Sequence, residues 1–259
     1  MITLRKFRIV VMLFFLQYLS ALSQVNTEAL RKDFKNDTLI NAVNASYQIA
    51  KGNTEYIGIG AGYRIDAFWG DYYSFLNASI DYKKAKETSI VDKGFLHCRL
   101  VYNLNSLIAP EVFYQKEFNK FISMKDRNLL GCGLRMNLHD LWQRDESNSL
   151  ELVLSSGIMA ENELLNFDSD STANAIRSTN YLSCRYKLND IVDFFGVLYF
   201  QVSFNKFSNY RMLNETGLRM RITKYLSFVT NFNYRLNNSA HHSLSKYDFN
   251  IINGLQFFF

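Results

Sequence analysis

The final segment of the sequence, residues 247–259, alternates between apolar and polar side chains and ends on three phenylalanines. One parity holds Tyr247, Phe249, Ile251, Leu255, Phe257 and Phe259, and the other holds Asp248, Asn250, Gly254 and Gln256. Because successive side chains of a strand point to opposite faces, this pattern predicts a strand with lipid on one face and polar surroundings on the other. An exposed aromatic edge strand is an aggregation hazard. We therefore expect this strand to be paired within a closed barrel.

Residues 1–23 have the features of a secretory signal peptide. Three basic residues precede an apolar run at 9–19, and Ala21-Leu22-Ser23 places small residues at the cleavage site. We predict cleavage before Gln24, a short periplasmic segment at 24–37 and a barrel at 38–259. The apolar run is shorter than the roughly 20 residues of a spanning helix. A mature membrane protein from this sequence would therefore cross the membrane with strands.

The charge and cysteine content exclude several classes of function. The formal net charge is +5, and cleavage would remove Arg5, Lys6 and Arg8. Basic and acidic residues are otherwise interspersed, so a nucleic-acid partner is not expected. The three cysteines are scattered and have no CxxC spacing, which gives no support for a disulfide scaffold or a zinc site. No metal or other cofactor is predicted.

About twelve alternating segments follow one another from residue 38 onward. Outer-membrane barrels use strands of about ten residues with alternating hydrophobicity. The sequence therefore predicts an all-β fold, a single closed antiparallel transmembrane β-barrel of about 12 strands. The expected strands are 39–50, 55–67, 72–83, 94–103, 107–117, 128–139, 150–160, 174–187, 192–205, 212–223, 226–236 and 247–259.

The connections between these segments differ in length. Those after the third, fifth, seventh and eleventh segments are long and polar, whereas most on the other rim are tight. This asymmetry is typical of outer-membrane barrels, which have long external loops. The acidic stretch 161–178 is accordingly predicted to be an external loop, since it lacks the glycine of a calcium-binding loop.

The polar parity of the strands carries both signs of charge. The residues predicted to line the lumen are Arg64, Asp81, Arg99, Glu111, Arg135, Glu151, Arg185, Glu215, Arg219 and Arg235. Charges in a narrow barrel must be paired or hydrated. One hypothesis is a narrow pore whose slight excess of basic groups favours anions. The other is a lumen filled by salt bridges, in a structural component of the envelope. The sequence does not distinguish the pore from the filled lumen.

Two short motifs resemble a known family. Gly52-Asn53-Thr54-Glu55 lies at the first hairpin, and Asp126-Arg127-Asn128 leads into Gly131-Cys132-Gly133 and Leu138. Together with the order of hairpins between Asn41 and Met159, these resemble the salt-induced outer membrane protein family, domain of unknown function 481. The resemblance covers about half of the chain, and Met136 replaces the family's usual tyrosine. It implies a barrel in the outer membrane of a Gram-negative cell and supplies no catalytic residues.

An enzyme is the alternative class, specifically an outer-membrane lipid-modifying hydrolase. Such an enzyme needs His, Ser and an orienting group together on the bilayer face. His97 has the inward parity, His139 ends a strand and His241-His242 lie in a loop. The protein is therefore predicted not to be an enzyme. A soluble lipid-binding barrel would need the apolar parity to face inward. The expected partners are outer-membrane lipid and the barrel-assembly machinery, through the strand ending at Phe259.

Overall fold

The computed structural model describes residues 38–50, 56–85, 88–138, 150–166, 170–240 and 244–258. The predicted signal peptide, its cleavage site before Gln24 and the segment 24–37 lie outside this range. So do the motif at 52–55, His139, His241, His242 and Phe259.

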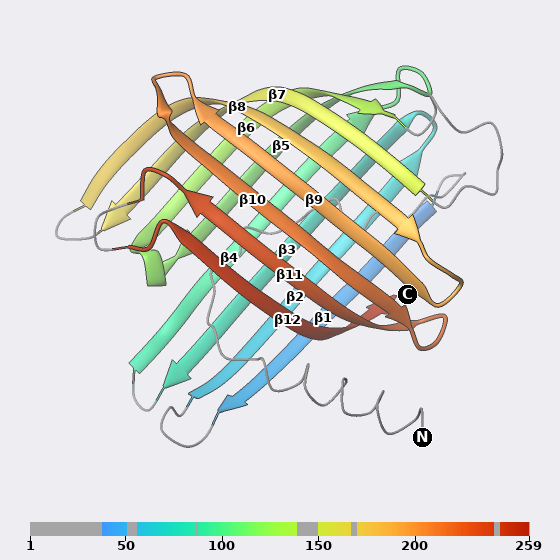
Figure 1. The fold of residues 1–259 in the computed structure, drawn as a ribbon, viewed down its shortest axis with the longest axis horizontal. Coiled ribbons are helices and arrows are strands. Elements are labelled where there is room, and N and C mark those ends of the chain that lie inside the picture. Colours follow the sequence, from blue (N-terminus) through green and yellow to red (C-terminus); the bar gives the residue numbers. More distant parts are fainter. Residues whose placement is uncertain are drawn as a thin grey trace, which may run out of the picture.

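The described residues form a closed antiparallel β-barrel of twelve strands, each paired with its neighbours in sequence (Figure 1). The predicted fold class is therefore confirmed. A short 3₁₀ helix, η1 (Lys120–Ile122), follows the fifth strand. The strands are β1 (Thr38–Ala50), β2 (Tyr56–Trp69), β3 (Tyr72–Ala85), β4 (Thr88–Tyr102), β5 (Ile108–Asn119), β6 (Met124–Asn137), β7 (Leu150–Asn166), β8 (Asp170–Lys187), β9 (Val192–Ser203), β10 (Lys206–Arg221), β11 (Leu226–Asn237) and β12 (Tyr247–Phe258).

The predicted long loops on one rim are mostly absent, because the strands extend into them. β3 ends at Ala85 and β4 begins at Thr88, and η1 occupies most of the connection from β5 to β6. The expected acidic loop at 161–178 is wrong: β7 continues to Asn166 and β8 begins at Asp170. The outer face of this extension carries Asn162 and Asn174, whose side chains hydrogen-bond to each other. Since both faces are polar there, the alternation that marks a spanning strand disappears although the pairing continues.

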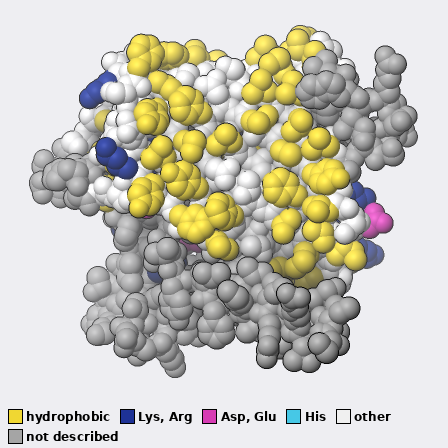
Figure 2. Space-filling view, viewed as in Figure 1, with side chains coloured by type: hydrophobic (Ala, Val, Ile, Leu, Met, Phe, Trp, Pro, Cys, Tyr) yellow, Lys and Arg dark blue, Asp and Glu magenta, His cyan; other side chains and the backbone are white. Residues whose placement is uncertain are grey.

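The two faces of the wall have opposite character. Ile59 and Leu134 are 55% and 46% exposed, whereas Arg64 and Arg135 are 0% and 2% exposed. Figure 2 shows hydrophobic side chains over the visible face, with Lys, Arg, Asp and Glu at its margins. Apolar groups therefore face outward and charged groups face inward, which is the arrangement of a membrane barrel. Within the described residues, no helix is long and apolar enough to cross a membrane.

Aromatic residues gather at the rim that holds the turn from β2 to β3. Trp69 stacks on Tyr72 with ring centroids 6.0 Å apart, and Tyr72 lies 4.9 Å from Tyr102 of β4. Gly70 closes this turn with a φ of 53°, in the left-handed region that glycine adopts without strain. All three rings are partly exposed. They form the kind of aromatic girdle that lies at a membrane–water boundary.

Candidate functional site

A buried network of charges, here called the rim cluster, lies near the end of the barrel where β7 meets β8. It consists of Glu117, Arg127, Glu161, Glu163, Arg177 and Arg211. Arg127 donates from Nη1 to Glu117 at 2.5 Å, and its Nη2 lies 2.6 Å from Glu161 Oε1. Glu161 also accepts hydrogen bonds from Arg177 and, at 2.5 Å, from Arg211 of β10. Because Glu161 contacts three arginines from three other strands, it ties this part of the wall together across the interior.

Sequence reasoning missed most of the rim cluster. Glu161 lay in the predicted loop 161–178, and Arg177 lay where that loop overlapped the predicted strand 174–187. Arg127 and Arg211 lay just outside predicted strands. Every one of these four side chains is buried. The signal that could have found them is charge complementarity at inward parity: Arg127 faces Glu117 and Glu163 in the register of β5, β6 and β7.

A second group, the waist cluster, lies between β4, β5, β6, β7 and β8. Arg99 donates from Nη1 to both Glu111 Oε2 and the Tyr181 hydroxyl, each at 3.2 Å. Tyr181 donates to Glu111 at 3.0 Å, and Ser155 donates to the other Glu111 oxygen at 2.7 Å. Arg135 Nη1 approaches the Tyr181 hydroxyl at 3.5 Å. The structure thus brings three predicted residues, Arg99, Glu111 and Arg135, into one buried network.

Arg64 belongs to a third buried set on the neighbouring wall. Its guanidinium makes a bidentate pair with Asp66, from Nε at 2.7 Å and Nη2 at 2.6 Å. Tyr73 donates to the same carboxylate at 2.7 Å, and the Phe75 ring lies 4.1 Å below the Arg64 guanidinium. Charge-assisted bidentate contacts of this kind fix the geometry as well as the charge balance.

The remaining predicted residues are distributed around these networks. Glu215, Arg219 and Arg235 are buried, with Arg219 3.9 Å from Asp193. Glu151 and Arg185 are half-buried and 3.8 Å apart, and Asp81 lies 3.3 Å from Lys93. That the ten residues line a path for solutes stays a prediction.

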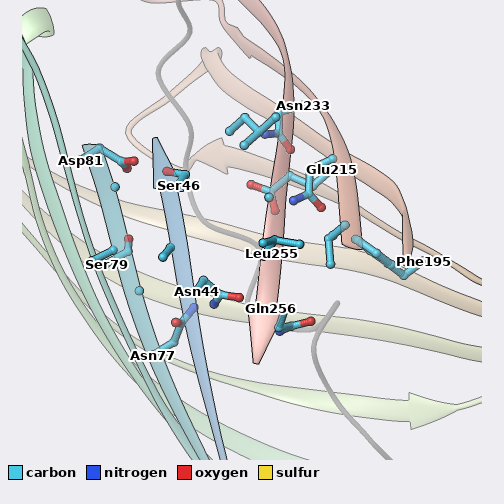
Figure 3. A pocket seen from close by; sticks show the side chains of 18 residues that line it. Asn44, Ser46, Asn77, Ser79, Asp81, Phe195, Glu215, Asn233, Leu255 and Gln256 are labelled. Atoms are coloured by element: carbon cyan, nitrogen blue, oxygen red, sulfur yellow. The ribbon is translucent and has the colours of Figure 1, made fainter. Parts of the chain in front are cut away.

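A cavity of about 220 Å³ lies on the opposite wall, formed by β1, β2, β3 and β9 to β12 (Figure 3). Carboxamides dominate its polar lining, together with two serines and two carboxylates. Among the described residues that line it, none is Lys or Arg. The polar lining residues are Asn44, Ser46, Asn77, Ser79, Asp81, Glu215, Asn231, Asn233 and Gln256. The described lining of this cavity is thus polar and holds acidic but no basic side chains, although ion pairs lie on β2, β9 and β10 as well.

The cavity adjoins the seam where the first and last strands close the barrel. β1 pairs with β12 at four positions, from Ala42↔Phe258 to Ala45↔Leu255. Against β2, by contrast, β1 pairs along its whole length. In the described part of the chain, the seam register does not extend beyond Ala45.

His97, the one described histidine with a potential catalytic role, lies inside the barrel. It is 3% exposed and its ring is stacked near Phe75, Phe95 and Phe113, with centroids 5.4–6.0 Å away. Its Nδ1 lies 3.1 Å from Gln115 Oε1. The hydrolase alternative requires such a ring on the bilayer face beside a nucleophile, and the position of His97 gives it no support. Within the described residues, no group of three or more His, Cys, Asp or Glu could hold a metal ion.

Comparisons with known proteins agree with the barrel geometry. The sequence model of the family described as "Protein of unknown function, DUF481" matches residues 43–259, a longer stretch than the two motifs indicated. No curated protein matches the chain. Among solved structures, the NanC porin superposes with a TM-score of 0.52 at 10% identity, covering 85% of this chain and 99% of that one. The COG4313 outer membrane channel from Pseudomonas putida F1 gives a TM-score of 0.53 at 8% identity, covering 92% and 100%. At these identities the likeness concerns the fold.

Proposed function

Since the chain belongs to the DUF481 family, whose description names no activity, we propose a function from the barrel itself: an outer-membrane channel for small polar solutes. The observation that carries this proposal is the uneven filling of the interior. The rim and waist clusters lie mainly on β4 to β8, with Arg211 joining from β10, and the polar cavity lies against β1 to β3 and β9 to β12. A solute path along the second wall would be narrow and lined by amides and carboxylates.

The buried charges favour a conducting role over a purely structural one. Burying ion pairs costs desolvation free energy that well-packed apolar groups of similar size do not incur. A barrel that served only as a sealed plug would gain stability from such apolar groups. Retained charges that border open polar space are consistent with a hydrated path whose field acts on solutes.

The residues that line the cavity indicate a different ion selectivity from the one that the predicted lumen residues indicated. The predicted lumen set has a slight excess of basic residues, which favours anions. Around the open space, however, the described ionisable side chains are Asp81 and Glu215, and Lys93 is close enough to Asp81 to offset its charge. We therefore propose that the channel conducts cations and neutral solutes better than anions, because both described ionisable side chains that line the cavity are acidic.

Planar-bilayer recording with the full-length protein tests this proposal. Stepwise conductance is expected, and the reversal potential in a KCl gradient should show preference for potassium at low salt, where screening is weak. Glu215→Gln should reduce the ratio of cation to anion permeability by about fivefold, equivalent to roughly 1 kcal/mol for one charge near the path. Glu151→Gln removes the same charge from a residue outside the cavity and should leave the ratio unchanged.

Two results would contradict the channel. A correctly folded barrel without conductance steps would assign the protein a structural role in the envelope. Anion preference that Glu215→Gln does not alter would place the conducting path elsewhere in the barrel.

A further inference from the structure

We infer that the cavity beside the β1–β12 seam is a binding site for a neutral, hydroxyl-rich group, such as a sugar ring. This site is distinct from ion conduction, because binding can occur whether or not the barrel passes current. The inference rests on the short seam, on one buried amide side chain and on the chemistry of the lining.

The short seam leaves room in the wall at the cavity. Past Ala45 and Leu255, β1 and β12 have no register with each other in the described residues. A Cβ atom built on Gly254 of β12 would meet no described residue within 4 Å. By comparison, one built on Gly157 of β7 would lie 2.2 Å from the Cys132 backbone oxygen of the neighbouring strand β6. A hollow therefore lies on the inner side of the wall at Gly254, in contrast to the close contact of β6 and β7 at Gly157.

The side chain of Gln256 lines this hollow, and its amide group is buried. The side chain is 1% exposed, and neither Oε1 nor Nε2 has a hydrogen-bond partner among the residues that the structure describes. In Figure 3, Gln256 lies at the edge of the cavity together with Asn44 and Leu255. A buried amide that makes no hydrogen bonds is costly and rare in folded proteins. A ligand that both donates to Oε1 and accepts from Nε2 would satisfy it, and a hydroxyl group does both.

The rest of the lining specifies the class of ligand. Asn44 and Asn77 offer further amide donors and acceptors, and Ser46 and Ser79 offer hydroxyl groups. The carboxylates disfavour an anion, since no described Lys or Arg lines the cavity. Its volume of about 220 Å³ corresponds to about seven water molecules at roughly 30 Å³ each. A single sugar ring or a small polyol matches this size and hydrogen-bonding pattern.

The sugar could come from two sources, since the cavity also touches the outer face of the wall. Ala45, Ala61 and Leu255 line it and are exposed on the lipid side. A free sugar would enter along the interior. The headgroup of a glycolipid would enter through the seam, with its alkyl chain remaining in the bilayer.

Calorimetric titration of the full chain in phosphatidylcholine vesicles tests the site with three probes. Glucose should bind saturably, and glucuronate, which has the same ring with a carboxylate, should bind at least about tenfold more weakly. Octyl glucoside, used below its micelle-forming concentration, distinguishes the sources. Affinity about tenfold above that of glucose would identify a lipid headgroup entering through the seam, and equal affinity would identify a free sugar.

Variants connect the binding to Gln256. Gln256→Leu should weaken glucose binding by about tenfold, as expected for the loss of two hydrogen bonds. Gln201→Leu is the matched control, because Gln201 is also buried on the inside of the barrel and lies outside the cavity. Gly254→Leu should abolish binding by filling the hollow while the barrel stays folded.

The inference would be overturned by absence of saturable glucose and octyl glucoside binding to the folded barrel, or by glucuronate binding as tightly as glucose. Equal weakening by Gln256→Leu and Gln201→Leu would also overturn it. Heat-modifiable gel migration of each variant establishes that the barrel is folded. A folded barrel that binds glucose but shows no conductance would contradict the proposed channel and would still support this binding site.

Discussion

At the scale of single residues, Glu161 is the centre of the barrel's charge balance. It is 4% exposed and bonds to Arg127, Arg177 and Arg211. Each of these arginines is buried, and their mutual repulsion is offset mainly by this carboxylate together with Glu117 and Glu163. Removing one member of a buried ionic network costs more than the network contributes as a whole, because the remaining charges stay desolvated.

Replacing Glu161 with glutamine should therefore destabilise the barrel although the side-chain volume is kept. We expect the free energy of unfolding to fall by about 3–5 kcal/mol, as for other broken buried pairs. Urea unfolding of the protein refolded into vesicles measures this change. Lys116→Ala, which breaks the exposed pair with Asp126 (2.9 Å), should leave the unfolding midpoint nearly unchanged. Equal effects of both variants would contradict a special role for Glu161.

At the scale of strands, the sequence predicted which elements form but not how far they extend. Apolar alternation located all twelve strands because lipid contact requires it on one face. Beyond the apolar band, pairing continues without that requirement, so β7 and β8 reach into a stretch whose composition is typical of a loop. Glu161 was missed for this reason, and Arg127 was missed because β6 likewise begins earlier than the predicted strand. Parity within the band was sufficient to place Arg64, Arg99 and Glu111 inside.

Close approach of neighbouring strands gives a prediction at this scale. Gly157 of β7 faces Gly133 of β6, and an added Cβ would lie 2.2 Å from the Cys132 carbonyl oxygen and 2.6 Å from Gly133 Cα. Because backbone atoms cannot yield without opening the pair, Gly157→Ala should cost about 1–3 kcal/mol. The same change at Gly254, where the added methyl meets open space, should be almost neutral. Comparison of the two urea midpoints checks this, and a neutral Gly157→Ala would show that β6 and β7 can separate at no cost.

At the scale of the whole molecule, closure of the barrel depends on the seam between β1 and β12. An open strand edge in hydrocarbon leaves backbone groups without partners, so membrane barrels normally close along their full height. Here the described seam holds four positions at the end near the C-terminus. Such a feature could not be predicted from alternation, because the register of the first strand against the last follows from the tilt and stagger accumulated around the barrel.

Paired cysteines can measure how far the seam is closed. In a background with Cys98, Cys132 and Cys184 replaced by alanine, Ala42→Cys with Phe258→Cys joins two positions that are opposite each other. Opposite residues of antiparallel strands have Cα atoms about 4.5–5.5 Å apart, within the range of a disulfide. Ser46→Cys with Gly254→Cys occupies the same register four residues further along, with the same side-chain parity. We expect rapid oxidation of the first pair in the folded barrel and much slower oxidation of the second. Mass spectrometry of the remaining free thiols over time measures the two rates. Equal rates would mean that β1 and β12 are joined well past Ala45, and the hollow at Gly254 would then be closed in the membrane.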